Sequence, residues 1–423
     1  MFKIIGSLRF LDRPSRTGWT LSMAPTARLR QQRWIRLLTA GLTCVLAAAC
    51  TSPVREDATP TSAASQSPTQ RDYWPTAGWR TAGPDQQGMD PAVLDDLDTA
   101  VPNFYPQVRS VLVIRHGYLV YERYWHGFTA SDGHDSRSVT KSFVSALVGI
   151  ALRDRHLESV DQTVEELLAD HLPANADPRL RKATVKQLLA MTSGLAGDDS
   201  SLDGDDKIWD RMARSRDWIR HILARRLESN PGERFAYSNA TSHLLSAIVA
   251  DTTGQSTLTF ARAELFGPLG IATDHALELT VNHWPVTQAE LNTFEQATVA
   301  WPRDPQGYHL GDSSLKLPAR DLAKLGYLYL NGGRWDGTQV VPADYVSAST
   351  QPQSDPGIGD YGYQWWVTDD YGYDTFRAQG YGGQLIYVIP ELDLVVVITS
   401  DPDQPRNDAG NLVWATIVPA VTG

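Results

Sequence analysis

The sequence contains few of the residues and motifs that hold metal ions or cross-link a chain. Among its 423 residues there are two cysteines, Cys44 and Cys50, too few for a cysteine metal site or a disulfide framework. The ten histidines form no H-E-x-x-H pair, which leaves zinc hydrolysis without support. A G-x-S-x-G run is also absent, which disfavours an α/β-hydrolase. We therefore expect no metal and no cofactor.

Positive charge is scarce beyond the N-terminus. The formal net charge is −11, and the first 49 residues hold eight Lys or Arg and one Asp, so the remaining chain carries −18. Bulk electrostatics on such an acidic chain disfavours nucleic acid and anionic lipid as partners. We expect no nucleic-acid partner.

The first 49 residues have the pattern of an export signal. Four arginines between positions 28 and 36 precede the apolar run Leu37–Ala49, which at 13 residues is too short to span a membrane. The run ends in small residues before Cys50, a pattern similar to a bacterial lipoprotein cleavage box. We expect residues 1–49 to be a lipoprotein-type signal peptide and Cys50 to anchor an exported protein on the outer face of the cytoplasmic membrane. Plain signal-peptidase cleavage nearby, giving a secreted protein, is the alternative.

The segment after Cys50 has the composition of a flexible tether. Residues 51–70 are rich in Thr, Ser, Pro and Ala, which favours disorder over a packed core. We expect a disordered tether over residues 50–72 and one folded domain over residues 73–423. A domain of about 350 residues can bury a large core without disulfides.

Strand patterns occur near both ends of this domain and helical patterns lie between them. Val108–Trp125 is rich in β-branched and aromatic residues around a His116-Gly117 turn. Residues 384–389 and 394–399 form a second hairpin around a Pro-Glu-Leu-Asp turn, and a final helix is expected over residues 408–421. The pattern predicts an α+β fold, in which an antiparallel sheet from both chain ends is flanked by helices and carries an inserted helical lobe.

One of the seven lysines stands in the run Ser138-Val139-Thr140-Lys141. Residues i and i+3 share a helix face, so the serine hydroxyl and the lysine amine would lie a few ångströms apart. A serine hydroxyl becomes an effective nucleophile when a neighbour takes its proton. The following residues, 142–152, are apolar nearly all round, which predicts a buried helix and a buried Lys141. The alternative is an ordinary helix start with a surface lysine.

Two further motifs follow later in the chain. Tyr237-Ser238-Asn239 comes after a Pro-Gly turn and before a helical pattern, where a simple helix cap by the asparagine is the alternative interpretation. The glycine-rich run at residues 380–384 lets a ligand or another backbone approach closely, and the alternative there is a bulge or a tight start of a strand.

The order S-x-x-K, Y-x-N, glycine-rich strand resembles the penicillin-recognising serine hydrolases. These include class C β-lactamases, DD-peptidases, related esterases and 6-aminohexanoate-dimer hydrolases. The resemblance covers about residues 75–423 and is closest to the 6-aminohexanoate-dimer hydrolase and esterase branch, with support from residues 188–195, 319–324 and 361–366. It implies the β-lactamase/DD-peptidase-like fold and an exported hydrolase that works through an acyl-serine intermediate.

The resemblance also implies roles for individual residues. Ser138 would be the acylated nucleophile, Lys141 would keep it activated, and Tyr237 would shuttle a proton to the leaving group. Which of Lys141 and Tyr237 is the acylation base stays open. The backbone N–H groups of Ser138 and Gln384 would form the oxyanion hole. The implied substrate-binding residues are Asn239, Tyr381, Gly382 and Gly383.

The third motif departs from the family pattern. β-Lactamases and DD-peptidases have Lys-Thr-Gly or His-Thr-Gly where this chain has Tyr381-Gly382-Gly383. The cation and the hydroxyl that help to hold a substrate carboxylate are therefore missing, which favours esters or amides over β-lactams. Two alternatives stay open: a β-lactamase or DD-carboxypeptidase, and a penicillin-binding or cell-wall interaction module without turnover. Residues 197–209 are a candidate lid with acidic residues that attract an amine, or else a solvated loop.

Overall fold

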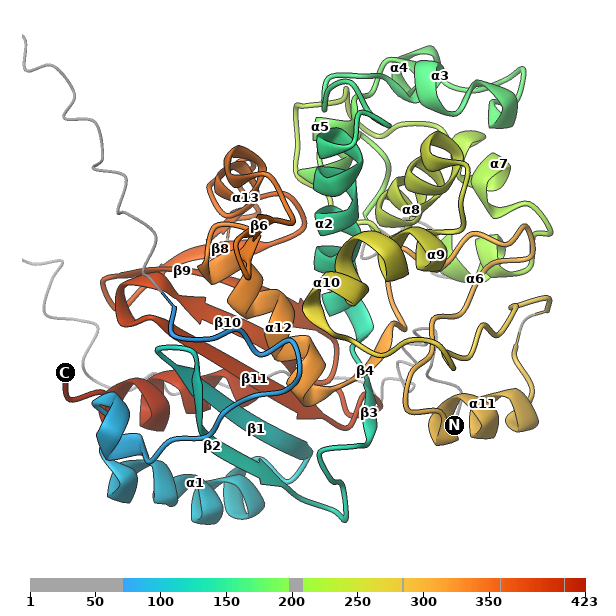
Figure 1. Cartoon of the computed structure of the whole chain (residues 1–423). Coiled ribbons are helices and arrows are strands. Elements are labelled where there is room, and N and C mark those ends of the chain that lie inside the picture. The colour runs from blue at the N-terminus through green and yellow to red at the C-terminus, as the bar shows by residue number, and fades with distance from the viewer. Residues whose placement is uncertain (1–70, 198–207, 284, 358, 407) are drawn as a thin grey trace, which may run out of the picture. The chain divides into compact units, whose positions relative to one another are not determined.

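The computed structural model describes residues 71–197, 208–283, 285–357, 359–406 and 408–423 (Figure 1). The predicted signal peptide, Cys50 and almost all of the predicted tether lie outside these ranges, as does most of the candidate lid. Those interpretations stay predictions. Within the described ranges, no helix has both the length and the apolar character that crossing a bilayer requires.

A seven-stranded antiparallel sheet joins the two ends of the domain. Its strand order is β2-β1-β11-β10-β9-β8-β7, so the N-terminal hairpin lies beside the C-terminal strands. The register pairs Val113 with Val396 between β1 and β11. The bounds are β1 Val108–Arg115, β2 Tyr118–Tyr124, β7 Asp360–Tyr361, β8 Trp366–Asp370, β9 Tyr373–Gly380, β10 Gln384–Ile389 and β11 Leu394–Ser400. The predicted sheet from both chain ends is confirmed.

The predicted turn between β1 and β2 is also confirmed. His116 has φ 51° and Gly117 has φ 87°, so both central residues adopt the left-handed region. Two positive φ values match the right-handed twist of the flanking strands, which is why such turns close hairpins. Two shorter ladders join β3 (Gly133–Asp135) to β4 (Lys316–Pro318) and β5 (Arg334–Trp335) to β6 (Thr338–Gln339).

Each face of the sheet packs against a different layer. Side chains alternate along a strand, so Leu112 and Ile114 join the core under α12 (Ala319–Leu330) and α2 (Thr140–Arg153). Val111 and Val113 point the other way, into the core formed with α1 (Pro91–Phe104) and the C-terminal helical segment. Figure 1 shows α12 across one face and α1 beyond the opposite one.

The C-terminal segment is helical as predicted but it is not one regular α-helix. It passes through 3-10 turns at Asp408–Gly410, a π-helical stretch at Val413–Ile417 and a second 3-10 turn at Val418–Ala420. Pro419 has no N–H to donate, so an α-helical ladder cannot continue through the last turn.

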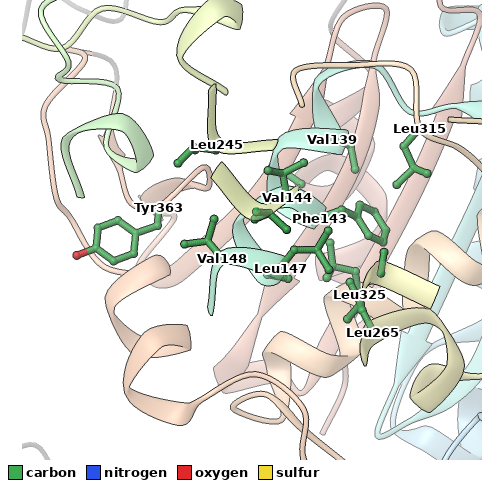
Figure 2. Close-up of a cluster of buried hydrophobic side chains, with 14 of the residues drawn as sticks. Val139, Phe143, Val144, Leu147, Val148, Leu245, Leu265, Leu315, Leu325 and Tyr363 are labelled. Carbon is green, nitrogen blue, oxygen red and sulfur yellow. The ribbon is translucent and has the colours of Figure 1, made fainter. Parts of the chain in front are cut away.

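The middle of the chain forms the predicted helical lobe, with α2 and α8 (Asn239–Thr253) side by side near its centre. In Figure 2 the α2 side chains of Phe143, Val144 and Leu147 meet apolar residues from distant parts of the chain. Full burial of one such side chain contributes about 1.5–3 kcal/mol. The other helices are α3 Val164–Leu167, α4 Pro178–Arg181, α5 Val185–Leu189, α6 Ile208–Ala213, α7 Trp218–Leu223, α9 Thr257–Ala261, α10 Gly267–Leu269, α11 Gln288–Gln296 and α13 Ala343–Ser349.

Candidate active site

Ser138 and Lys141 lie together at the start of α2. Ser138 belongs to a single 3-10 turn, Arg137–Val139, which leads directly into the helix. The Lys141 Nζ atom is 3.0 Å from the Ser138 Oγ atom, as the spacing predicts. Lys141 is 1% exposed, so the alternative of a surface lysine is wrong. The half-buried serine is thus in direct contact with a buried amine.

The backbone just before Ser138 is strained and tightly held. Arg137 has φ 49°, a backbone conformation that residues other than glycine adopt only at a cost in free energy. Its N–H donates to the Asp135 Oδ1 atom at 2.9 Å, and its Nε atom is 3.2 Å from Asp135 Oδ2. Its guanidinium also donates to the Pro402 carbonyl at 3.0 Å. These contacts fix the turn that presents the Ser138 hydroxyl.

Lys141 has two further partners. Its Nζ atom donates to Asn239 Oδ1 at 2.6 Å and to the Asp312 carbonyl oxygen at 2.7 Å. Both partners are acceptors, so a neutral amine would spend its two N–H groups on them and keep its lone pair for the Ser138 hydroxyl. An ammonium group would instead donate to all three. The arrangement therefore suits both the state that takes a proton from Ser138 and the state that holds it.

Asn239 reaches Lys141 because it does not cap its own helix. The N-cap of α8 is Ser238, whose side chain accepts the Thr241 N–H, and Asn239 is the first helical residue. The alternative of a simple asparagine cap is therefore wrong. The structure brings this predicted binding residue to the lysine from 98 positions further along the chain.

Tyr237 lies beside Lys141 but presents its ring rather than its hydroxyl. The Lys141 Nζ atom is 4.9 Å from the centre of the Tyr237 ring. The ring stacks on Trp366 with centroids 6.0 Å apart and planes at 18°. Among the residues that the structure describes, the Tyr237 hydroxyl makes no hydrogen bond. The predicted proton shuttle needs this side chain to turn toward Ser138, and it stays a prediction.

The glycine-rich motif is a tight turn that joins β9 to β10. Gly382 and Gly383 have φ 82° and 91°, and a Cβ at Gly382 would be 2.7 Å from the Asp401 carbonyl oxygen. The Gln384 side chain donates to the Ser400 carbonyl at 2.9 Å and accepts the Ser400 N–H at 3.1 Å. These contacts attach the turn to the end of β11.

Gly380, at the end of β9, makes the contact with the serine turn. A Cβ at this position would be 2.5 Å from the Ser136 carbonyl oxygen and 3.0 Å from the Arg137 Cβ atom. The next residue, Tyr381, is 43% exposed. Gly380 opens the predicted glycine-rich run, and the close approach of another backbone that this run predicts is confirmed here.

The sequence did not indicate the roles of two further buried residues, Asp312 in contact with Lys141 and Gln364 in contact with Ser142. The Asp312 carboxyl is fully buried, accepts the Ser313 hydroxyl at 2.9 Å, and has its pKa raised by burial, which the charge of Lys141 opposes. Gln364 has φ 61° and accepts the Ser242 hydroxyl of α8 at 2.7 Å, while its amide donates to the Leu189 carbonyl at 2.7 Å. Its own carbonyl accepts the Ser142 hydroxyl of α2 at 2.7 Å.

The neighbouring residues Trp365 and Trp366 have different surroundings. Trp365 is fully buried in the core, whereas Trp366 is half-buried and stacks on Tyr237. Trp366 also meets Tyr361 at 5.0 Å and Phe235 at 6.2 Å between ring centroids. These rings form one aromatic wall next to Lys141. Across the described ranges, no group of three or more His, Cys, Asp or Glu side chains is placed to hold a metal ion.

The fold and the site define the class of serine hydrolases whose serine is paired with a lysine. The Beta-lactamase family model matches residues 107–416, and the chain belongs to this family. It is 26% identical over 341 residues to the 6-aminohexanoate-dimer hydrolase of Paenarthrobacter ureafaciens, covering 73% of this chain and 79% of that protein.

Two solved structures show the same fold. A family VIII carboxylesterase matches with a TM-score of 0.59 and 16% identity, covering 80% of this chain and 98% of its own. EstCE1, a hydrolase with promiscuous acyltransferase activity, matches with a TM-score of 0.61 and 18% identity, covering 78% and 97%. The expected β-lactamase/DD-peptidase-like fold is confirmed, and the protein is an enzyme of the serine hydrolase type.

Proposed function

We propose that this protein is an exported hydrolase that cleaves an ester or amide bond through an acyl-Ser138 intermediate. The observation that carries the proposal is the 3.0 Å contact between Lys141 Nζ and Ser138 Oγ at the start of a buried helix. Lys141 is also held by two acceptors, so its amine stays aimed at the serine. The 6-aminohexanoate-dimer hydrolase relative and the carboxylesterase neighbour support amide or ester chemistry.

The first half of the reaction forms the acyl-enzyme. Ser138 Oγ attacks the substrate carbonyl carbon while its proton passes to the neighbouring amine of Lys141. The tetrahedral intermediate then breaks its bond to the leaving group, which takes up that proton directly or through the Tyr237 hydroxyl. Because Lys141 touches Ser138 and the Tyr237 hydroxyl does not, the geometry favours Lys141 as the base in this step.

The second half returns the free enzyme. A water molecule attacks the acyl carbon, gives its proton to the same base, and the bond to Ser138 Oγ breaks as the serine recovers its proton. In both halves the substrate carbonyl oxygen becomes anionic. Two N–H groups that donate to it would stabilise the transition state by several kcal/mol. The Ser138 N–H is one. The contact of Gly380 with the serine turn supports the Tyr381 N–H as the second, in competition with the predicted Gln384 N–H.

The walls of the site favour an uncharged, apolar acyl group. Tyr237 and Trp366 form a stacked aromatic surface beside Lys141. Tyr381 stands where the family motif has a cation, and Gly382 stands where it has threonine. The motif therefore offers a substrate carboxylate neither the cation nor the threonine hydroxyl. Both features support esters or amides over penicillins, although family membership keeps a β-lactamase or DD-carboxypeptidase activity as the alternative.

Export and lipid anchoring are part of the proposal and rest on the sequence pattern before Cys50. Radiolabelled palmitate should enter the native protein and not a Cys50→Ser variant. Recovery of both proteins from the soluble extracellular fraction would argue for plain secretion instead.

Hydrolysis of p-nitrophenyl butyrate, the linear 6-aminohexanoate dimer and nitrocefin tests the proposed activity. We expect ester or amide turnover that Ser138→Ala abolishes and Ser136→Ala retains, since the Ser136 hydroxyl contacts Thr140 and not Lys141. Rapid nitrocefin turnover would show a β-lactamase. Stable acylation without product would show a binding module.

A further inference from the structure

A second buried polar side chain follows Asn239 on the same face of α8. His243 is four residues after Asn239, so the two side chains project in the same direction. Both His243 and its partner Asp304 are fully buried. The reaction proposed above uses neither residue. Burying an imidazole and a carboxylate costs free energy, which favours a structural or functional role for the pair.

The hydrogen bonds define the state of the imidazole. The Gly311 N–H donates to His243 Nδ1 at 3.3 Å, so this nitrogen carries a lone pair. The proton is therefore on Nε2, which lies 3.2 Å from Asp304 Oδ2. The other Asp304 oxygen accepts the N–H groups of Gln306 and Tyr308 at 2.8 and 2.9 Å. Asp304 thus shapes the segment that leads to Gly311 and orients the histidine that holds it.

The segment anchored by His243 is the one that holds Lys141. The residue after Gly311 is Asp312, whose carbonyl oxygen accepts the Lys141 Nζ–H at 2.7 Å. Gly311 is pressed against α8, because a Cβ there would lie 2.2 Å from the Ser242 carbonyl oxygen. Ser314, two residues after Asp312, has φ 68°. A segment with this conformation needs fixed anchors on both sides of the Asp312 carbonyl.

We propose that His243 is a positioning residue for Lys141 in the hydrolysis proposed above. By accepting the Gly311 N–H it fixes the Asp312 carbonyl, and this carbonyl together with Asn239 Oδ1 aims the Lys141 amine at Ser138. Both acceptors of Lys141 are therefore set from α8, one directly and one through the imidazole. Asp304 keeps the imidazole in the tautomer that the Gly311 N–H requires.

Two isosteric substitutions separate the two nitrogens of His243. In His243→Asn the amide oxygen can take the place of Nδ1 and accept the Gly311 N–H, but the contact with Asp304 is lost. In His243→Gln the amide can reach Asp304, but no acceptor faces Gly311. We expect kcat/KM for p-nitrophenyl butyrate to fall about 10- to 100-fold in His243→Gln, mainly through kcat, since small misplacements of a catalytic group cost this much. His243→Asn should stay within about threefold of the native protein.

A stability control keeps the result interpretable. Ser110→Ala removes an equally buried hydrogen bond, to Thr399 within the sheet, and should lower the melting temperature while leaving kcat/KM unchanged. All assays are made below the onset of melting, with active sites counted by fluorophosphonate labelling. Equal losses in His243→Asn and His243→Gln, or losses that follow melting temperature across all three variants, would overturn the proposal.

The experiment distinguishes a failure of the positioning role from a failure of the proposed hydrolase function. If Ser138→Ala retained ester turnover, the proposed function would fail whatever the His243 variants do. If Ser138→Ala is inactive and His243→Gln is as active as the native protein, only the positioning role fails.

Discussion

The sheet and the region around Ser138 and Lys141 are held together by different kinds of contact. Every residue of β10 and β11 is buried, and their side chains are mostly valine, isoleucine and leucine. Around Lys141, buried polar groups bond to partners far away in the chain. The Asp312 backbone carbonyl accepts from Lys141, and the side chains of His243 and Gln364 bond to Gly311 and Leu189. Apolar burial is non-directional, whereas each buried polar group needs a particular partner.

The strands of the sheet, apart from their turns, also differ in backbone conformation from the segments around Ser138 and Lys141. No residue of β1, β9, β10 or β11 has a positive φ, whereas Arg137, Ser314 and Gln364 do. Arg137 precedes Ser138, Ser314 lies two residues after Asp312, which holds Lys141, and the Gln364 carbonyl accepts the Ser142 hydroxyl beside Lys141. We infer that the sheet and its covering helices stabilise the fold. This stability offsets the cost of the strained backbone and buried polar groups around Ser138 and Lys141.

The largest effect is expected at Lys141 itself. Lys141→Met should lower kcat/KM by about 10³- to 10⁴-fold, the upper part of the range that proton transfer by a positioned side chain contributes. Steady-state kinetics with p-nitrophenyl butyrate measures this loss.

Lys324 is the matched control for this substitution. It is another buried lysine, but it pairs with Asp321 at 3.0 Å and donates to the Gly270 carbonyl at 2.8 Å. Lys324→Met should lose stability and keep its activity. Similar activity losses in both variants would remove the distinction between the two regions.

Gln364 should affect stability and activity together. Gln364→Leu leaves the buried Ser242 hydroxyl without its acceptor, at about 1–3 kcal/mol, whereas the Leu189 carbonyl loses the side-chain amide but keeps the N–H of residue 364. Because the lost amide holds Ser242 of α8, the helix that begins with Asn239, kcat/KM should fall about tenfold.

Ile386 in β10 provides the comparison from the sheet. Ile386→Ala should cost about 2–5 kcal/mol of unfolding free energy and leave kcat/KM unchanged below the melting transition. Urea unfolding and kinetics on both variants make the test. An activity loss in Ile386→Ala that equals that of Gln364→Leu would contradict the account.

His134, on β3 leading to the serine turn, should make the fold sensitive to acid. Burial lowers the pKa of His134 to about 3. Between its ordinary value and this value the unfolded chain binds a proton that the folded chain does not, so stability falls as pH decreases. His134→Phe should reduce the drop in melting temperature between about pH 7 and about pH 4.5. An unchanged drop would exclude His134 as its source.

The smallest effect is expected at Asp312, with the opposite sign. Burial raises the pKa of this carboxyl, so the folded chain keeps a proton that the unfolded chain has released, and stability falls as pH rises above about 4. The melting temperature of Asp312→Asn relative to the native protein should therefore increase from about pH 4 to about pH 7. A difference that does not vary with pH would contradict this assignment.

Local patterns in the sequence predict most of the fold. The His116-Gly117 turn, the hairpin around residues 390–393 and the apolar helix after Lys141 each depend on neighbours in the chain, and all three are confirmed. Strands at both chain ends predicted one shared antiparallel sheet, whereas its strand order and the strands β7, β8 and β9 were not predicted.

The site was only partly predictable, because its details depend on contacts between distant segments. Lys141 meets Asp312 across 171 residues, and no local pattern indicates which remote carbonyl an amine will reach. Gln364 was overlooked for the same reason, since it joins α2, α5 and α8. The glycine-rich run at residues 380–384 predicted a close backbone approach, but the sequence does not show that Gly380 is the glycine that meets the turn before Ser138.

Labelling with a fluorophosphonate, followed by peptide mass mapping, tests the central claim most directly. Ser138 Oγ would displace fluoride and form a stable phosphonyl ester. The account predicts one adduct on Ser138 that disappears in Ser138→Ala, forms far more slowly in Lys141→Met, and forms at the native rate in Lys324→Met. An adduct on another residue, or an unchanged labelling rate in Lys141→Met, would contradict a serine nucleophile activated by its buried lysine.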